Sequence, residues 1–361
     1  MGFDRILDQA AVKDVLRRSA IRQRLAHAYL FTGPEGVGKD AMAIELAKLV
    51  NCTNDSSSSE PCEQCSDCRQ IQTLTHPDVS LVFAAPAKIK EDEWIKLVQQ
   101  KANDPYQPLT YSPTSSILIE RIRELRKEAG FRAYKGKYRV IIISEAERMT
   151  QEAANALLRL LEEPPERYIL ILTSARPNQL LPTIISRCQL IKFSPIPETE
   201  IVRGLVERGI ESSQAQVIAR LAMGNFRKAV QLTQEDYQEY RKLALELIVI
   251  GIGDDPLAKL DFVKKLTIGR DRGKVKEILQ IALLWLRDAY FVGQDQIGQS
   301  DLRKHLYNYD RWDEVQKLAQ LCQRVNLEKT ITATEKSIDL VEKNVYINLV
   351  LITLLNQFSQ N

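Results

Sequence analysis

Residues 33–40 read Gly33-Pro34-Glu35-Gly36-Val37-Gly38-Lys39-Asp40, and this stretch decides the fold of the 361-residue chain. It follows a short apolar run and opens a segment with helical spacing. Every fixed position of the phosphate-binding pattern G-x-x-x-x-G-K-[ST] is matched except the last. In such a loop the backbone amides and the helix N-terminus cradle phosphates, and the lysine reaches the β and γ oxygens. We therefore expect ATP or ADP to be held by Gly33, Gly36, Gly38, Lys39 and Asp40. A glycine turn that binds nothing is the alternative.

Two positions that hold Mg²⁺ in a hydrolysing site of this kind are altered. Asp40 replaces the hydroxyl residue, and its carboxylate adds a negative charge near the phosphates, although a carboxylate can also hold magnesium. The β-branched run from Arg139 to Ile143 predicts a buried strand, after which a hydrolysing protein carries a carboxylate pair. Here Glu145 keeps the water-activating position, but Ser144 replaces the metal-binding Asp. We expect impaired Mg²⁺ binding and weak or absent hydrolysis, with Glu145 as a vestigial catalytic group.

Strand-like and helix-like segments alternate through the first half of the chain. Further strands are predicted at 79–84, 168–173 and 184–193, and Thr150 can cap a helix that Pro164 and Pro165 end. This alternation predicts an α/β domain with a parallel sheet and helices on both faces. Residues 85–116 contain four prolines and are expected to form a surface insertion to which we assign no role.

Strand signals largely cease after the hinge-like sequence Ser194-Pro195-Ile196-Pro197. Three short amphipathic helices are predicted up to about residue 232, and the remainder is helical throughout. We therefore predict three domains: an α/β nucleotide-binding domain over 1–194, a small helical lid over 195–235, and an all-α domain over 236–361.

Four of the six cysteines lie between Cys52 and Cys68, in the spacing Cys52-x9-Cys62-x2-Cys65-x2-Cys68. Four thiolates with two overlapping C-x-x-C units suit a closed tetrahedral Zn²⁺ site, and with no ligand missing the site should be structural. An iron–sulfur cluster and free buried thiols are the alternatives.

The chain has 50 basic and 47 acidic residues and a net charge of +3, so its composition alone does not indicate nucleic-acid binding. No run approaches about 18 apolar residues, and the first residues lack the apolar core of a signal peptide. We therefore expect no membrane span and a location in the cytoplasm.

Three further side chains are candidates for sensing or completing a nucleotide site. Arg187, in Ser186-Arg187-Cys188, follows a helical segment and can project from the domain to a neighbouring subunit's ATP, with a surface salt bridge as its alternative role. Arg227 opens a helix beyond the hinge, where it can reach nucleotide held by Lys39. Thr173 ends the strand after Glu145, a position suited to contact phosphate.

Together these pieces resemble the clamp-loader branch of the AAA+ ATPases, in particular the delta-prime subunits of bacterial DNA polymerase III. The resemblance covers residues 1 to about 230 well and the rest loosely. It rests on the phosphate loop and cysteine module and on these further motifs: Arg24-Leu25-Ala26-His27-Ala28-Tyr29-Leu30-Phe31, His76-Pro77-Asp78, Asn155-Ala156-Leu157-Leu158-Arg159-Leu160-Leu161-Glu162-Glu163-Pro164-Pro165, Ser186-Arg187-Cys188 and Trp285-Leu286-Arg287-Asp288.

The resemblance implies a subunit of a hetero-pentameric loader, with gamma or tau and delta subunits as partners. The sliding clamp and primer–template DNA would be reached through the complex. It also implies that Arg187 is an arginine finger acting in trans and that the C-terminal helices form an oligomerisation collar. No polymerase active site is evident. Two competing interpretations are an active ATP-hydrolysing subunit of the gamma/tau kind, and a stand-alone zinc-containing DNA-binding protein.

Overall fold

The computed structural model describes residues 2–54, 59–86, 88–107, 109, 111–112, 115–129, 134–233, 236–293 and 305–359. The chain divides into two compact units, Met1–Gly209 with Ala222–Ala229, and Ile210–Leu221 with Val230–Asn361. The predicted lid over 195–235 is shared between these units, so the three-domain division stays a prediction.

The first unit is built on a parallel sheet of five strands in the order β2-β3-β4-β1-β5. The central strands are almost entirely buried, which explains their continuous apolar sequences. The predicted parallel α/β class is therefore confirmed. The strands are β1 (Ala28–Thr32), β2 (Val79–Val82), β3 (Arg139–Ile143), β4 (Tyr168–Ser174) and β5 (Gln189–Lys192).

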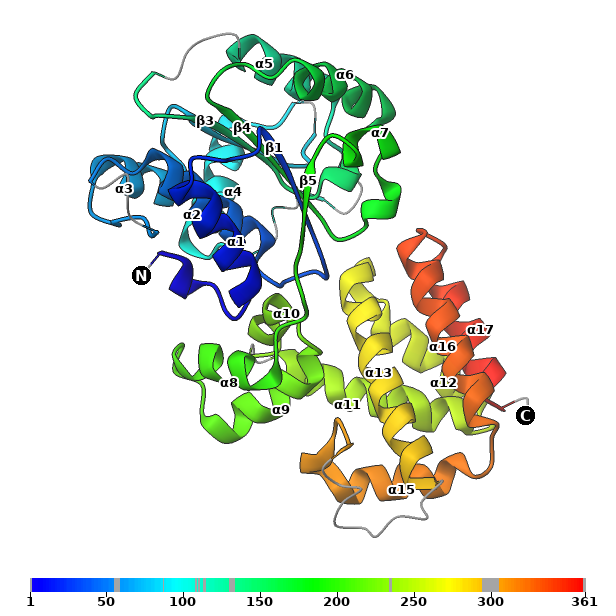
Figure 1. Ribbon diagram of the computed structural model, residues 1–361. Coiled ribbons are helices and arrows are strands. Elements are labelled where there is room, and N and C mark those ends of the chain that lie inside the picture. Colours follow the sequence, from blue (N-terminus) through cyan, green and yellow to red (C-terminus); the bar gives the residue numbers. More distant parts are fainter. Residues whose placement is uncertain are drawn as a thin grey trace. The chain divides into compact units, whose positions relative to one another are not determined.

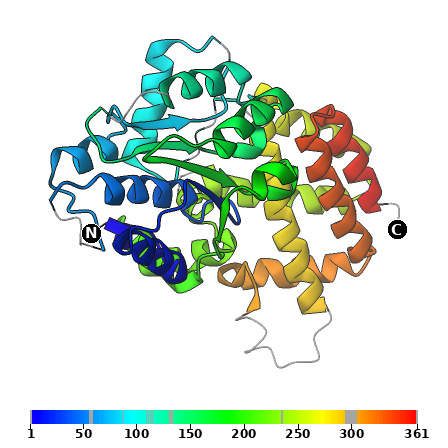
Figure 2. The same ribbon diagram turned by 45° about the horizontal axis from the view of Figure 1, so that its top comes forward.

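Helices cover both faces of this sheet (Figures 1 and 2). On one face, alternate strand residues such as Leu30, Ile141 and Leu170 pack in one cluster with Leu157 of α6. The helices of this face are α5 (Ile119–Ala129), α6 (Gln151–Glu162) and α7 (Pro182–Ile185); the other face carries α2 (Lys39–Asn51), against which α1 (Ala10–Ile21) packs. As predicted, the Thr150 side chain caps α6 by accepting a hydrogen bond from the Ala153 amide.

The segment 85–116 contains a folded helix, α4 (Glu91–Asn103). Trp94 on α4 stacks on Phe83, which follows β2, with ring centroids 4.3 Å apart, and Lys101 at its end is 1% exposed. Apart from Lys101, the residues of α4 are exposed or half-buried, so the segment predicted as a surface insertion contains a helix, and its extent as an insertion stays a prediction.

Short elements complete the first unit and lead into the second. They are the 3-10 turns Gly2–Arg5, Ala146–Arg148 and Pro177–Gln179, and the helices α3 (Ser66–Gln72), α8 (Glu198–Val206), α9 (Ser212–Ala222) and α10 (Phe226–Gln231). The last three confirm the three short helices predicted after the hinge.

The second unit is helical throughout its described residues. Trp285 of α13 is fully buried at its centre, and α13 packs on α11, α15 and α16. Besides α9, its helices are α11 (Asp236–Ile252), α12 (Pro256–Leu266), α13 (Arg272–Gly293), α15 (Trp312–Cys322), α16 (Leu327–Glu342) and α17 (Ile347–Ser359), with 3-10 turns at Ile268–Arg270 and Tyr309–Arg311. Among the described residues, no helix is both long enough and apolar enough to cross a bilayer.

Candidate nucleotide site and metal centre

The phosphate loop leaves the carboxyl end of β1 and enters α2, as the sequence predicts. Gly38 is the residue before α2 and has φ 92°, and Gly36 has φ 69°. Both angles favour glycine. A Cβ on Gly36 would lie 1.7 Å from the Asn225 side-chain oxygen, so the close approach of α10 to the loop also requires glycine there. Gly33 begins the loop directly after β1.

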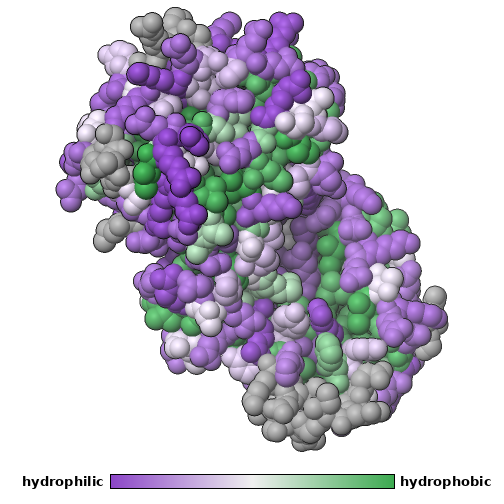
Figure 3. Space-filling model, viewed as in Figure 1, coloured by the Kyte–Doolittle hydropathy of each residue, from purple (hydrophilic) through white to green (hydrophobic). Residues whose placement is uncertain are grey.

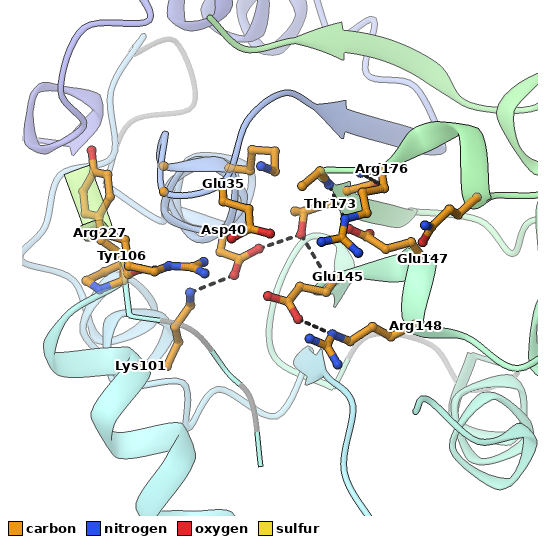
Figure 4. A pocket seen from close by; sticks show the side chains of 17 residues that line it. Glu35, Asp40, Lys101, Tyr106, Glu145, Glu147, Arg148, Thr173, Arg176 and Arg227 are labelled. Carbon is orange, nitrogen blue, oxygen red and sulfur yellow. Dashed lines mark hydrogen bonds and ion pairs between the residues drawn. The ribbon is translucent and has the colours of Figure 1, made fainter. Parts of the chain in front are cut away.

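The carboxylate of Asp40, in the first turn of α2, is held by three side chains, two of which, Lys101 and Thr173, are labelled in Figure 4. The Lys101 ammonium lies 2.7 Å from Oδ2, which also accepts a hydrogen bond of 2.8 Å from Ser144. Thr173 donates to Oδ1 at 2.7 Å. The two altered metal positions, 40 and 144, are therefore bonded to each other, and Lys101 provides the positive charge.

These contacts fix the charge state of the cluster. Burial alone would raise the pKa of Asp40, but the ion pair with Lys101 and the three hydrogen bonds outweigh it and hold that pKa well below its usual value. Burial lowers the pKa of Lys101, and the facing Asp40 opposes this shift. Asp40 is therefore ionised, and its charge is neutralised within the protein.

Lys39 turns back onto its own loop. Its Nζ donates to the Gly33 carbonyl at 2.8 Å and to the Pro34 carbonyl at 2.5 Å. Burial, with Arg227 nearby, lowers the pKa of Lys39 to about 8, and Asp40 partly opposes the shift. The ammonium lies at the loop, where a phosphate could replace the carbonyls as its partner.

Glu145, the candidate water-activating residue, follows β3 in the left-handed conformation, with φ 50°. Its carboxylate pairs with Arg148 at 2.6 Å, and its amide donates to the Thr173 hydroxyl at 3.3 Å. Burial raises the pKa of Glu145. The side chain is thus engaged in an ion pair in this structure.

A cavity of about 210 Å³ brings most of the predicted residues together. Gly36, Gly38, Lys39, Asp40, Glu145, Thr173 and Arg227 all line it, whereas Gly33 and Arg187 do not. Arg227 also donates to the Tyr106 carbonyl at 3.2 Å. Lys101, Tyr106, Arg148 and Arg176 also line the cavity, and no sequence motif marks them.

Arg187 lies beyond the end of α7, away from this cavity. It pairs with Glu162 at 2.8 Å and donates to the Thr183 carbonyl at 3.0 Å, with its side chain 36% exposed. In the single chain it therefore makes the surface salt bridge that was its alternative role.

The four clustered cysteines converge as their spacing predicts. Their sulfur atoms all lie within 4.8 Å of one another, and the Cys62 and Cys68 sulfurs are 3.9 Å apart. Four zinc–sulfur bonds of about 2.3 Å in a tetrahedron place the sulfurs roughly 3.8 Å apart, so this donor set fits zinc. The amides of Cys62, Cys65 and Cys68 donate to cluster sulfurs at 3.3–3.4 Å, which orients the thiolates.

Comparisons with known proteins find relatives among DNA polymerase III subunits. A family model described as "DNA polymerase III, delta subunit" matches residues 8–197. The chain is 33% identical over 240 residues to DNA polymerase III subunit delta' of Bacillus subtilis, covering 66% of this chain and 64% of that protein. It is 32% identical over 240 residues to DNA polymerase III subunit tau of the same organism, and the match covers 64% of this chain and 37% of that protein. The matched region thus covers less than two thirds of either relative. A DNA polymerase III gamma subunit-related protein of Thermotoga maritima resembles the structure with a TM-score of 0.44 and 17% identity, over 96% and 98% of the two chains.

The sheet order, with a phosphate loop after β1 and a helical continuation, defines an AAA+ protein. Within this class, the chain belongs to the DNA polymerase III delta subunit family, and the predicted resemblance to clamp-loader subunits is confirmed.

Proposed function

We propose that this chain is a delta-prime-type subunit of a sliding-clamp loader in DNA replication. In this role it supplies Arg187 to the ATP site of a neighbouring gamma or tau subunit and hydrolyses little or no ATP itself. The observation that carries the proposal is the enclosure of Asp40 by Lys101, Ser144 and Thr173. Neither altered position offers a free metal ligand, and hydrolysis in P-loop proteins depends on the metal these positions hold.

The setting of Arg187 suits action on a neighbour. Its pair with Glu162 is exposed, at 36% and 48% for the two side chains, and exposed ion pairs contribute little to stability. The guanidinium can therefore exchange the carboxylate for a phosphate at small cost. Its planar set of donors matches phosphate oxygens and would stabilise charge on the transferred group.

The remaining parts take supporting roles in this proposal. Cys52, Cys62, Cys65 and Cys68 hold a structural Zn²⁺, and the second unit forms the collar of a hetero-pentamer with gamma or tau and delta subunits. In support, Figure 3 shows apolar side chains between α13 and α16, and Leu257, Tyr346 and Leu349 are more than half exposed. Contacts with the clamp and primer–template DNA arise through the complex, in the cytoplasm.

An active subunit of the gamma/tau kind is the second candidate, favoured by the 32% identity to a tau subunit. In that case Asp40 and Glu145 would hold magnesium. Lys101 opposes this, because its ammonium lies 2.7 Å from the same Asp40 oxygen.

The test is steady-state ATP hydrolysis by the reconstituted loader with clamp and primed DNA. Loss of an arginine finger costs about 10³-fold or more in turnover at the served site, so Arg187→Ala should lower turnover strongly. Lys39→Ala should change it little.

The matched control is Arg167→Ala, which removes an exposed arginine from the amino end of β4, at the opposite edge of the sheet from the phosphate loop. This variant should hydrolyse ATP at the wild-type rate. If Lys39→Ala is instead the damaging change and the purified chain hydrolyses ATP alone, the protein is a motor subunit.

A further inference from the structure

The Lys101 ammonium occupies a place where P-loop enzymes need a metal. In those enzymes a hydroxyl after the loop lysine and an Asp at a strand end hold Mg²⁺. Here the corresponding residues, Asp40 and Ser144, are hydrogen-bonded to each other at 2.8 Å. Lys101 reaches them from α4, is 1% exposed, and is fixed by a second hydrogen bond of 2.7 Å to the Gln107 carbonyl.

Magnesium does not fit among these side chains. Mg²⁺ takes six oxygen ligands at about 2.0–2.1 Å in octahedral geometry. Both Asp40 oxygens already accept hydrogen bonds, and a metal on Oδ2 would compete with an ammonium 2.7 Å from that oxygen. Two cations sharing one buried oxygen repel strongly, because little water screens them.

The site nevertheless keeps groups that attract phosphate. Lys39, Arg176 and Arg227 line the cavity together with the N-terminal turn of α2. Its volume of about 210 Å³ is below the roughly 300–1,000 Å³ of common ligand pockets, so the phosphates of a nucleotide would lie inside the cavity and the nucleoside would bind at its edge.

We infer that this site binds a metal-free nucleoside di- or triphosphate, with the Lys101 ammonium in the place of Mg²⁺. The inference deepens the proposed function, since it rests on the same impaired site. The bound nucleotide would be a structural ligand that persists through the loader's cycle, because no metal is present to promote its hydrolysis.

The test is the affinity of the purified full-length chain for ADP, measured by calorimetry in EDTA and in excess Mg²⁺. The affinity for total ADP in EDTA should equal that in Mg²⁺ within about threefold, or exceed it. Pyrophosphate should bind more weakly than ADP. An ordinary magnesium requirement, or equal binding of pyrophosphate and ADP, would overturn the inference.

For a designed variant we expect the opposite dependence of ADP affinity on Mg²⁺. The triple substitution Asp40→Thr, Lys101→Met and Ser144→Asp removes the ammonium and restores a hydroxyl and a carboxylate at the metal positions. It should bind ADP about tenfold more tightly with Mg²⁺ than with EDTA. Lys96→Met, which removes an exposed lysine from the same helix, should behave as wild type. Melting curves and zinc content confirm that each variant is folded.

The wild-type titration also separates this inference from the proposed function. If the folded wild-type chain binds ADP in neither buffer, the site is closed and the inference is wrong. Arg187 can still serve the neighbour in that case, and the hydrolysis assay of the loader decides that question independently.

Discussion

The side chains that hold Asp40 come from three separate parts of the first unit: Lys101 from α4, Ser144 from the end of β3 and Thr173 from β4. Asp40 and Lys101 form a buried pair of opposite charges, with side chains 12% and 1% exposed. Removing one partner of such a pair lowers the free energy of unfolding far more than replacing both with neutral residues, because the remaining buried charge has no partner.

We predict that Lys101→Met destabilises the first unit by about 3–5 kcal/mol, since it leaves the Asp40 carboxylate buried and unpaired. The double variant Lys101→Met with Asp40→Asn should recover much of this loss. Urea unfolding followed by circular dichroism measures both. Equal losses in the single and double variants would show that Lys101 acts through its packing, not its charge.

We also predict a pH dependence of phosphate binding. Burial lowers the pKa of Lys39 to about 8, and phosphate requires the protonated form. The affinity for ADP should therefore be constant below about pH 8 and fall above it, by up to about tenfold per pH unit for one linked proton. Calorimetric titration at several pH values measures this slope. Lys39→Arg keeps its charge over this range and should show no slope from this position, so a persistent slope would assign the proton to another group.

Among the elements, the cysteine module is tied to α2 by Lys48. This lysine is 1% exposed, and its Nζ lies 2.6 Å from Glu45 on α2 and 2.6 Å from Glu63 in the module. It also donates to Gln72 at the end of α3, at 2.9 Å. Because α2 directly follows the phosphate loop and begins at Lys39, unfolding of the cysteine module would remove contacts that stabilise the helix carrying Lys39.

Metal analysis should find about one Zn²⁺ per chain, bound by the four clustered cysteines. Cys65→Ser should lower the zinc content and the melting temperature, the latter by at least about 5 °C, because each kcal/mol lost shifts it by roughly 2–4 °C in a domain of this size. Cys188→Ser removes a cysteine outside the cluster and should retain the metal. Zinc binding unaffected by Cys65→Ser would exclude this site.

The elements differ in how far local sequence could predict them. The phosphate loop, the central strands and the cysteine module were predictable, since glycine spacing, β-branched runs and C-x-x-C units act over a few residues. Lys101 was not, because it meets Asp40 across 61 positions and nothing near it marks a buried lysine. The helix within 85–116 was not predictable for a similar reason: the composition of this segment does not reveal that Trp94 of α4 packs on Phe83.

At the scale of the whole molecule, the chain divides into two compact units. In the second unit, the Arg241 side chain is 1% exposed and donates hydrogen bonds of 2.8 Å to the side chains of Asp310 and Asn308. It lies over the ring of the buried Trp285. The guanidinium carbon lies 5.8 Å from the centre of that ring. Asp288 in turn accepts a hydrogen bond of 2.7 Å from the Asn308 amide. This polar network fixes the segment around Asn308 against α11 and α13.

The last prediction uses this network to test whether the units unfold independently. Arg241→Met removes the cation and leaves Asp310 partly buried, which should destabilise the second unit by about 3–5 kcal/mol. Of the three tryptophans only Trp94 lies in the first unit, so in a Trp94→Phe background fluorescence reports on the second unit alone. Zinc release during urea unfolding reports on the first unit.

The fluorescence transition of Arg241→Met should move to lower urea while zinc release keeps its midpoint. Arg324→Met, which removes an exposed arginine of the second unit, should move neither transition. A common shift of both signals would mean that the units unfold as one cooperative body. In that case a substitution that destabilises the second unit would also lower the free energy of unfolding of the first unit, which carries the phosphate loop.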